Sequence, residues 1–143
     1  TIATMRAIND GHRFIINFGS AGSVSDITGL VEVTGYVDRD MDARALSCEL
    51  GQTPFEDGII IGEHGIVCGS GDKFATSKPE IACDIVDMEA YAIAKTCLKE
   101  EVTFRSWKYI SDSADENSAS DWEENVHKGN KLFQTVLYRG GFS

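Results

Sequence analysis

The side chains best suited to chemistry in this sequence are the acidic and hydroxyl groups of Ser111, Asp112, Ser113 and Asp115. They follow residues 102–110, a mostly apolar and aromatic run that predicts a buried strand. In open α/β sheets, ligands bind at the carboxyl ends of the strands. The sequence therefore predicts that Asp112 lies at the mouth of a sheet, where its carboxyl group can act as a general acid.

An earlier strand also ends in residues that suit a binding site. Residues 13–18 predict a buried strand, and the small residues 19–23 predict a loop after it. Backbone N–H groups in such a loop can turn inward and hold an anion or a water molecule. A plain tight turn is the simpler alternative, because glycine is common wherever the backbone needs a positive φ.

Two later segments offer an aromatic ring and a second carboxylate. Residues 65–71 predict a strand that leads to Phe74, which either packs in the core or offers a flat face for stacking; the spacing alone favours packing. Residues 83–86 predict a short strand and residues 90–98 a helix. Glu89 lies at this junction, where it complements the helix dipole or contacts a ligand; without further context the first alternative is favoured.

The remaining segments complete an alternating pattern of strands and helices. We expect the end of a helix over 1–10, a strand over 29–37, a short apolar run over 58–62 and a helix over 120–137. The last helix is predicted to begin at a capping box, with Ser120 as N-cap and Glu123 at position N3. This alternation predicts one layered α/β domain over residues 1–143.

Composition excludes several classes of partner. The chain has 143 residues and a net charge of −10, which argues against binding to nucleic acid or to an anionic membrane. It contains no apolar run near the ~20 residues that span a bilayer. Its four cysteines are far apart, and most lie in apolar stretches. They predict free thiols in a reducing, cytoplasmic protein.

The sequence predicts no metal and no other cofactor. Residues 38–42 carry alternating aspartates with the spacing of a calcium loop. Ala43, however, occupies the sixth position, where the sharp turn of such a loop requires glycine. A solvated or interface loop is therefore favoured. The three histidines are not close to any predicted group of ligands.

Four segments, in order, resemble the purine nucleoside phosphorylase/nucleosidase superfamily. They are residues 18–22 (FGSAG), 70–74 (SGDKF), 86–90 (VDMEA) and 110–115 (ISDSAD). The chain is most similar to the methylthioadenosine/S-adenosylhomocysteine nucleosidase family. This resemblance implies a three-layer phosphorylase/hydrolase-like α/β fold with a central mixed sheet. The first strands of that family have no counterpart here, so we expect an N-terminally truncated domain.

The resemblance implies cleavage of the N-glycosidic bond of a purine nucleoside. Asp112 matches the acid that protonates the purine, and Ser111 would orient it. The acid must retain its proton near neutral pH, so its surroundings should disfavour the carboxylate.

The same resemblance assigns the sugar and the base. Glu89 would accept hydrogen bonds from the ribose 2′- and 3′-hydroxyls, because a carboxylate offers two acceptor oxygens to a cis-diol. Met88 would pack on the ribose. Phe74 would stack on the base, and the backbone of Ala75 would read its polar edge.

The identity of the nucleophile stays open at this point. Ser20, Ala21 and Gly22 match the segment that holds water or phosphate. Lys108 stands where the nucleosidases carry arginine, four residues before the acid, and keeps the charge without the planar fork. The leading hypothesis is a nucleosidase that uses water. The alternatives are a phosphorylase that uses phosphate and a nucleoside-binding protein without turnover.

The sequence also predicts a homo-oligomer, most simply a dimer. Residues 40–42 and 51–52 resemble the segment of the family that reaches toward a neighbouring subunit. A sheet without its first strands would also expose an edge or a core surface that requires a partner.

Overall fold

The computed structural model describes residues 1–56 and 58–140, which form one mixed sheet flanked by helices. The strands of this described part are β1 (Phe14–Ser23), β2 (Leu30–Val33), β3 (Gly35–Asp38), β4 (Ile61–Gly62), β5 (Val67–Ser70), β6 (Ile85–Asp87) and β7 (Thr103–Asp112). The helices are α1 (Ile2–Asn9), α2 (Ala90–Lys99), α3 (Ser118–Asn125), α4 (Asn130–Arg139) and the 3₁₀ turn η1 (Arg44–Leu46). The strand order is β2-β7-β1-β6-β5-β3-β4.

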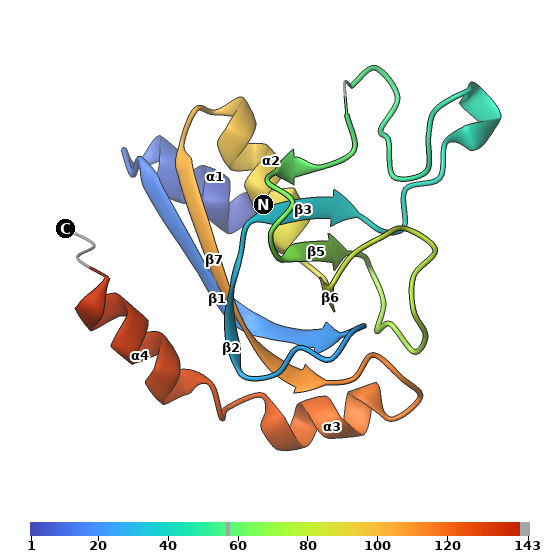
Figure 1. The fold of residues 1–143 in the computed structure, drawn as a ribbon. Helices are drawn as coiled ribbons and strands as arrows, with labels where there is room; N and C mark the ends of the chain where they lie inside the picture. The colour runs from blue at the N-terminus through green and yellow to red at the C-terminus, as the bar shows by residue number, and fades with distance from the viewer. Residues whose placement is uncertain (57, 141–143) are drawn as a thin grey trace.

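The helices cover the two faces of the sheet, with α1 and α2 on one side and α3 and α4 on the other (Figure 1). Two residues of β1, three positions apart and therefore on opposite faces, show what each face packs against. Phe18 stacks on Phe133 of α4, with ring centroids 4.9 Å apart. Ala21 packs in a buried cluster with Ala90 and Ala94 of α2. Because side chains of a strand point alternately to opposite faces, β1 is covered on both, and the three-layer α/β fold is confirmed.

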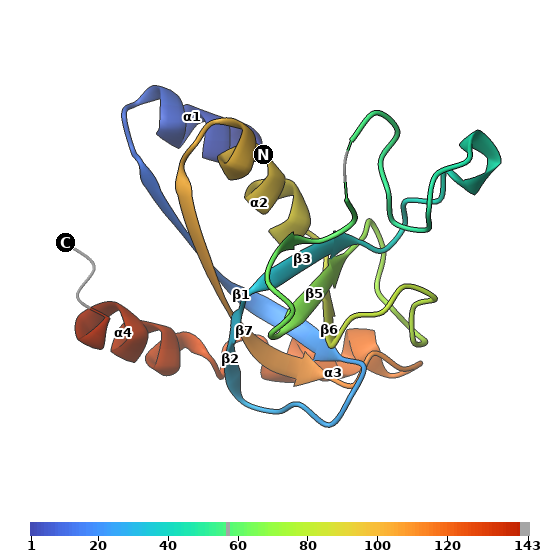
Figure 2. The same cartoon turned by 45° about the horizontal axis from the view of Figure 1, so that its top comes forward.

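The two longest strands, β1 and β7, pair in parallel (Figure 2). Gly19 lies opposite Lys108 in this pair, and the register shifts between Ala21 and Gly22. The shift sets Gly22 opposite Asp112, so β7 contains one extra residue, a β-bulge. The bulge determines which face of the sheet the last residues of β7 address.

The strand expected over 29–37 is two strands that meet at Thr34. β2 pairs antiparallel with β7, whereas β3 pairs parallel with β5. These partners are separated in the sheet by β1 and β6, so one straight strand cannot pair with both. The chain therefore bends sharply between β2 and β3, and the sheet curls (Figure 1).

The loop expected over 19–23 is also wrong, because β1 continues to Ser23. Gly22 and Ser23 pair with Val86 and Ile85 of β6, so the small residues remain in the sheet. The other predicted strands are present with shifted bounds. The apolar run expected over 58–62 contributes only β4, whose partner is β3.

The single helix expected over 120–137 is two helices, and its capping box is not formed. α3 begins after Asn117 rather than at Ser120. Between α3 and α4, Gly129 lies against Tyr109 of β7, where an added Cβ would come within 2.7 Å of the Tyr109 Cβ. This close approach of the chain to the sheet separates the two helices.

The helices expected over 1–10 and 90–98 are confirmed as α1 and α2. The four cysteines are free, and Cys68 and Cys97 are buried. No helix in residues 1–56 and 58–140 is long and apolar enough to cross a membrane.

Candidate functional site

One cavity of about 320 Å³ lies where β1, β6 and β7 end and where the loop after β5 passes over them. It brings together nine of the site residues predicted from the sequence. They are Ser20, Ala21, Gly22, Phe74, Ala75, Met88, Glu89, Ser111 and Asp112. The tenth, Lys108, lies beneath the wall and does not line the cavity. Residues from four separate segments of the chain thus meet in one concave site.

Asp112 is the last residue of β7, and its carboxyl group is held from two sides. Ser111 Oγ donates a hydrogen bond to Oδ2 at 2.9 Å, and the backbone N–H of Ala114 donates to Oδ1 at 2.9 Å. A Cβ on Gly22 would clash with Oδ1, so only glycine allows β1 this close to the acid. The carboxyl group is therefore fixed against the cavity wall.

The turn that carries this acid is secured by α3. Asn125 Nδ2 donates a hydrogen bond to the backbone oxygen of Ser111 at 2.9 Å. Asp115, further along the turn, caps the chain locally, because its Oδ1 accepts from the N–H of Asn117 at 2.9 Å. Asp115 does not line the cavity, so the two aspartates of this segment have different positions.

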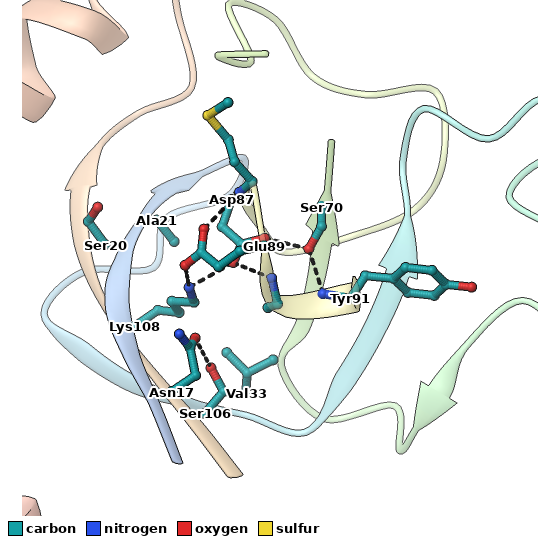
Figure 3. A network of polar contacts seen from close by, with 12 residues as sticks. Asn17, Ser20, Ala21, Val33, Ser70, Asp87, Glu89, Tyr91, Ser106 and Lys108 are labelled. Atoms are coloured by element: carbon teal, nitrogen blue, oxygen red, sulfur yellow. Dashed lines mark hydrogen bonds and ion pairs between the residues drawn. The ribbon is translucent and has the colours of Figure 1, made fainter. Parts of the chain in front are cut away.

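Glu89 lies at the junction of β6 and α2, with its carboxylate at the edge of the cavity. Its Oε1 accepts a hydrogen bond from Lys108 Nζ, and its Oε2 accepts from the N–H of Met88 at 3.3 Å. The Glu89 side chain is nevertheless 45% exposed, so it remains accessible to a ligand (Figure 3). Met88 beside it is 49% exposed.

Behind Glu89 lies a buried network of charged and polar groups (Figure 3). Lys108 is fully buried, and its Nζ lies 2.7 Å from Asp87 Oδ2. Asp87 also accepts hydrogen bonds from Ser70 Oγ and from the N–H of Ala90. Ser70 Oγ in turn accepts from the N–H of Tyr91 at 2.9 Å. These bonds compensate the loss of hydration that each buried group incurs.

The protonation of Lys108 follows from these neighbours. Burial alone would lower the pKa of this ammonium group, but the carboxylates of Asp87 and Glu89 outweigh burial and raise the pKa above its ordinary value. Lys108 is therefore a cation at neutral pH. Gly19 makes room for it, since a Cβ there would lie 2.8 Å from Nζ and 3.0 Å from Glu89 Oε1.

This position changes the expectation for Lys108. The resemblance implies that Lys108 helps to hold the nucleophile or an anion, but its side chain has no exposed surface and its ammonium group is bonded to two carboxylates. Because side chains alternate between the two faces of a strand, the Lys108 side chain points into the protein, behind the cavity wall. Lys108 supports the site from behind.

Phe74 and Trp122 form the aromatic side of the cavity. Phe74 is 43% exposed and lies edge-on to Trp122, with ring centroids 6.0 Å apart. It is not the packing residue that its spacing favours. Trp122 Nε1 donates a hydrogen bond to Ser20 Oγ at 2.8 Å. This bond connects α3 to β1 across the cavity, and no sequence pattern predicts it, because Trp122 lies far from Ser20 along the chain.

Arg39, which follows β3, also lines the cavity, and like Trp122 it is not among the site residues predicted from the sequence. Its side chain is only 4% exposed and donates a hydrogen bond to the backbone oxygen of Lys73. Asp87, also in the wall, could have been noticed from the sequence because it directly precedes Met88 and Glu89 at the end of a strand. Arg39 had no such signal, because its burial arises from the loop after β5.

In the acidic segment 38–42, Asp42 forms an ion pair with Arg44, two residues later in the chain. Arg44 binds both carboxylate oxygens of Asp42, at 2.9 and 2.6 Å. The hydrogen bonds from Arg44 lower the pKa of Asp42 to about 2. In the part of the chain that the structure describes, no group of three or more His, Cys, Asp or Glu side chains is arranged to hold a metal.

The fold and the site define an α/β protein with a small-molecule cavity at the strand ends of a curled mixed sheet. The family model described as "Phosphorylase superfamily" matches residues 26–139. The chain belongs to this superfamily.

Curated relatives point to one group within the superfamily. The 5′-methylthioadenosine/S-adenosylhomocysteine nucleosidase of Haemophilus ducreyi is 32% identical over 77% of this chain and 60% of its own length. The protein of the same name from Staphylococcus saprophyticus is 29% identical over 89% of this chain and 69% of its own length. The chain thus spans about three fifths of the Haemophilus ducreyi protein.

Solved structures agree with this grouping. The Helicobacter pylori 5′-methylthioadenosine/S-adenosylhomocysteine nucleosidase superposes with a TM-score of 0.84 at 26% identity, covering 95% of this chain and 73% of that one. The futalosine hydrolase of the same organism superposes with a TM-score of 0.81 at 25% identity, covering 89% and 67%.

The buried ion pair generates a prediction about stability. Lys108→Met leaves Asp87 buried without its cation, so we expect the free energy of unfolding to fall by about 3–5 kcal/mol. Lys95→Met is the control, because Lys95 pairs with Glu56 at a partly exposed position and should change it by ~1 kcal/mol or less. Urea denaturation at pH 7 measures both. Equal stability of the two variants would show that the network contributes little.

Proposed function

We propose that this cavity binds a purine nucleoside and promotes hydrolysis of its N-glycosidic bond. The observation that carries the proposal is that Asp112, at the end of β7, and Glu89, between β6 and α2, line one cavity together with Phe74 and Met88. Such a cavity offers an acid, a diol acceptor, a stacking ring and an apolar contact. The nucleosidase relatives support the same reaction, and one solved Helicobacter pylori relative holds 5′-methylthioadenosine in its active site.

At the base, Asp112 acts as the general acid. As the bond between C1′ and N9 breaks, its electrons pass into the purine ring, and N7 takes the proton from the Asp112 carboxyl group. The purine then leaves as a neutral molecule rather than as an anion. Ser111 orients the carboxyl group, and Phe74 stacks on the ring. Ser118 Oγ donates to the Ala75 carbonyl at 3.1 Å, which fixes the backbone that faces the base edge.

At the sugar, Glu89 accepts hydrogen bonds from the 2′- and 3′-hydroxyls. The ribose ring gains positive charge as the bond breaks, as in other glycoside hydrolyses. A nearby carboxylate stabilises that charge, and hydrogen bonds to an ionised acceptor are stronger than neutral ones. Met88 packs on the sugar beside it.

Water is the nucleophile that best fits this cavity. Glu89 lies at the edge of the cavity, and its carboxylate disfavours a phosphate dianion beside it. Lys108 offers no free cation to hold phosphate, because it is buried and paired with Asp87 and Glu89. Water held near Ser20, Ala21 and Gly22 adds to C1′, and the proton it loses returns through solvent to Asp112.

Replacing the two carboxyl groups should separate their roles. We expect Asp112→Asn to lower kcat for purine release by about 100- to 10,000-fold, the usual contribution of a general acid. Glu89→Gln should lower kcat/KM by about 10- to 100-fold, because it weakens charge-assisted hydrogen bonds to the sugar. The rate of adenine release from 5′-methylthioadenosine, monitored by chromatography, measures both effects.

Asp115→Asn is the matched control, because Asp115 lies on the same turn but outside the cavity, and its activity should stay within a few-fold of the parent. Equal rates for Asp112→Asn and Asp115→Asn would refute the assignment of the acid. Stabilisation by purine nucleosides without any release of base would instead identify a nucleoside-binding protein.

Phosphorolysis is the second candidate. Arg39 and Lys73 also belong to the cavity wall, and two cations could hold a phosphate. The decisive measurement is the rate of base release from adenosine, inosine and 5′-methylthioadenosine with and without inorganic phosphate. We expect equal rates and an unphosphorylated C1 hydroxyl on the sugar product, which is ribose from adenosine and inosine and 5-methylthioribose from 5′-methylthioadenosine. A rate that requires phosphate, with a ribose 1-phosphate product, would establish a phosphorylase.

We also propose that the chain forms a homodimer through the segment that follows β3. In this segment Leu46 is 69% exposed and Phe55 is fully exposed, and large apolar side chains at such positions commonly mark an interface. Light scattering after size-exclusion chromatography should give twice the chain mass. Leu46→Ser combined with Phe55→Ser should shift the mass toward the monomer. A parent chain that elutes as a monomer at all concentrations would exclude the dimer.

A further inference from the structure

We infer that Lys108 is a positioning residue that locks Glu89 in place, and that discrimination between ribose and 2′-deoxyribose depends on this buried lysine. The inference rests on the proposed function, because it assumes that Glu89 binds the sugar. Lys108 itself touches no ligand, since it does not line the cavity and its side chain is fully buried.

The first step is that Glu89 needs an anchor. It is 45% exposed and lies where β6 gives way to α2. A glutamate side chain at such a position has several accessible rotamers, and binding a sugar must pay for their loss. The bond from Lys108 Nζ to Oε1 fixes one oxygen before any ligand arrives. Preorganised acceptors lose less entropy on binding.

The second step is that the anchor is itself immobile. Lys108 Nζ is also bonded to Asp87 Oδ2 at 2.7 Å, and Asp87 is only 1% exposed. Asp87 is fixed in turn by Ser70 Oγ and by the N–H of Ala90 at 3.0 Å. Residues of β5, β6, α2 and β7 together therefore fix the position of the ammonium group (Figure 3). The bond from this group to Oε1 in turn fixes the Glu89 carboxylate.

The third step concerns the space around the pair. Gly19 of β1 lies opposite Lys108 in the parallel ladder. A Cβ at this position would lie 2.8 Å from Lys108 Nζ, closer than real Cβ atoms come, and 3.0 Å from Glu89 Oε1, which is tight. The glycine therefore leaves room for the Lys108–Glu89 bond, and a larger residue would force this pair to shift.

The consequence is selectivity for the diol. A 2′-deoxyribose removes one donor from the carboxylate. If Glu89 is fixed, it cannot turn to recover that bond, and an unsatisfied charged acceptor in a binding site lowers affinity strongly. If Glu89 is free to move, it can turn toward water or toward the remaining hydroxyl, and the penalty shrinks. Loss of the lysine should therefore lower activity on the ribose substrate more than activity on the 2′-deoxyribose substrate. The preference for ribose then falls.

The test compares kcat/KM for adenosine and 2′-deoxyadenosine in Lys108→Met, Gly19→Ala and the parent. We expect the parent to prefer adenosine by about 10- to 100-fold, the range for hydrogen bonds to a charged group. In both variants this preference should fall by at least about fivefold. Lys95→Met is the control, and its preference should equal that of the parent.

Gly19→Ala guards against a loss of folding in Lys108→Met, because it keeps the buried lysine and only adds a methyl group against Nζ and Glu89 Oε1. The ratio of two substrates also cancels any reduction in the fraction of folded protein. A preference that stays at the parental value in both variants would overturn the inference, even where total activity falls.

Glu89→Gln separates this inference from the proposed function. If Glu89→Gln leaves the preference unchanged, Glu89 does not bind the sugar, and both proposals fail at that point. If Glu89→Gln abolishes the preference while Lys108→Met and Gly19→Ala keep it, only the role of Lys108 is refuted. If the parent releases no base, the dissociation constants of the two nucleosides, measured by calorimetry, supply the same ratio.

Discussion

The ammonium group of Lys108 is buried between two carboxylates, and the arrangement of the site depends on it. A buried charge is tolerated only where partners replace its hydration, so Lys108 requires Asp87 and Glu89 to stay within bonding distance. These two residues lie just before α2, whereas Lys108 belongs to the long strand β7. The ion pair thus fixes the position of the second carboxylate relative to the strand that carries the acid.

β7 therefore has two functions in one strand. Lys108 points to the inner face of the curled sheet, and four residues later the β-bulge presents Asp112 at the cavity wall. β1 matches both features with residues that lack a side chain. Gly19 leaves room for the lysine and its carboxylates, and Gly22 leaves room for the acid. The glycines in this strand are explained by what lies opposite them, since neither has a positive φ.

The two acidic groups of the proposed site are placed to act on different parts of a nucleoside. The proposed acid ends β7 and the proposed sugar acceptor lies between β6 and α2, so in the proposed reaction a nucleoside meets a proton donor at its base and a carboxylate at its sugar. The wall contains three acidic residues, Asp87, Glu89 and Asp112, and two basic residues, Arg39 and Lys73. Because these charges nearly balance, the proposed preference for water over phosphate rests on the nucleosidase relatives and on the absence of a free charge on Lys108.

The sequence by itself determined the α/β class, the helices α1 and α2, and nine residues that the structure gathers around one cavity. The α/β class and the helices follow from local hydrophobic periodicity, whereas the nine residues follow from the resemblance of four short segments to the nucleosidase family. It did not determine that β1 continues to Ser23, that the chain bends at Thr34, or that α3 and α4 are separate. Those features depend on pairing and packing between distant segments. Tertiary structure also decided the position of Lys108 and the contribution of Trp122 and Arg39, because burial and partnership of a polar side chain arise only when remote strands and loops meet.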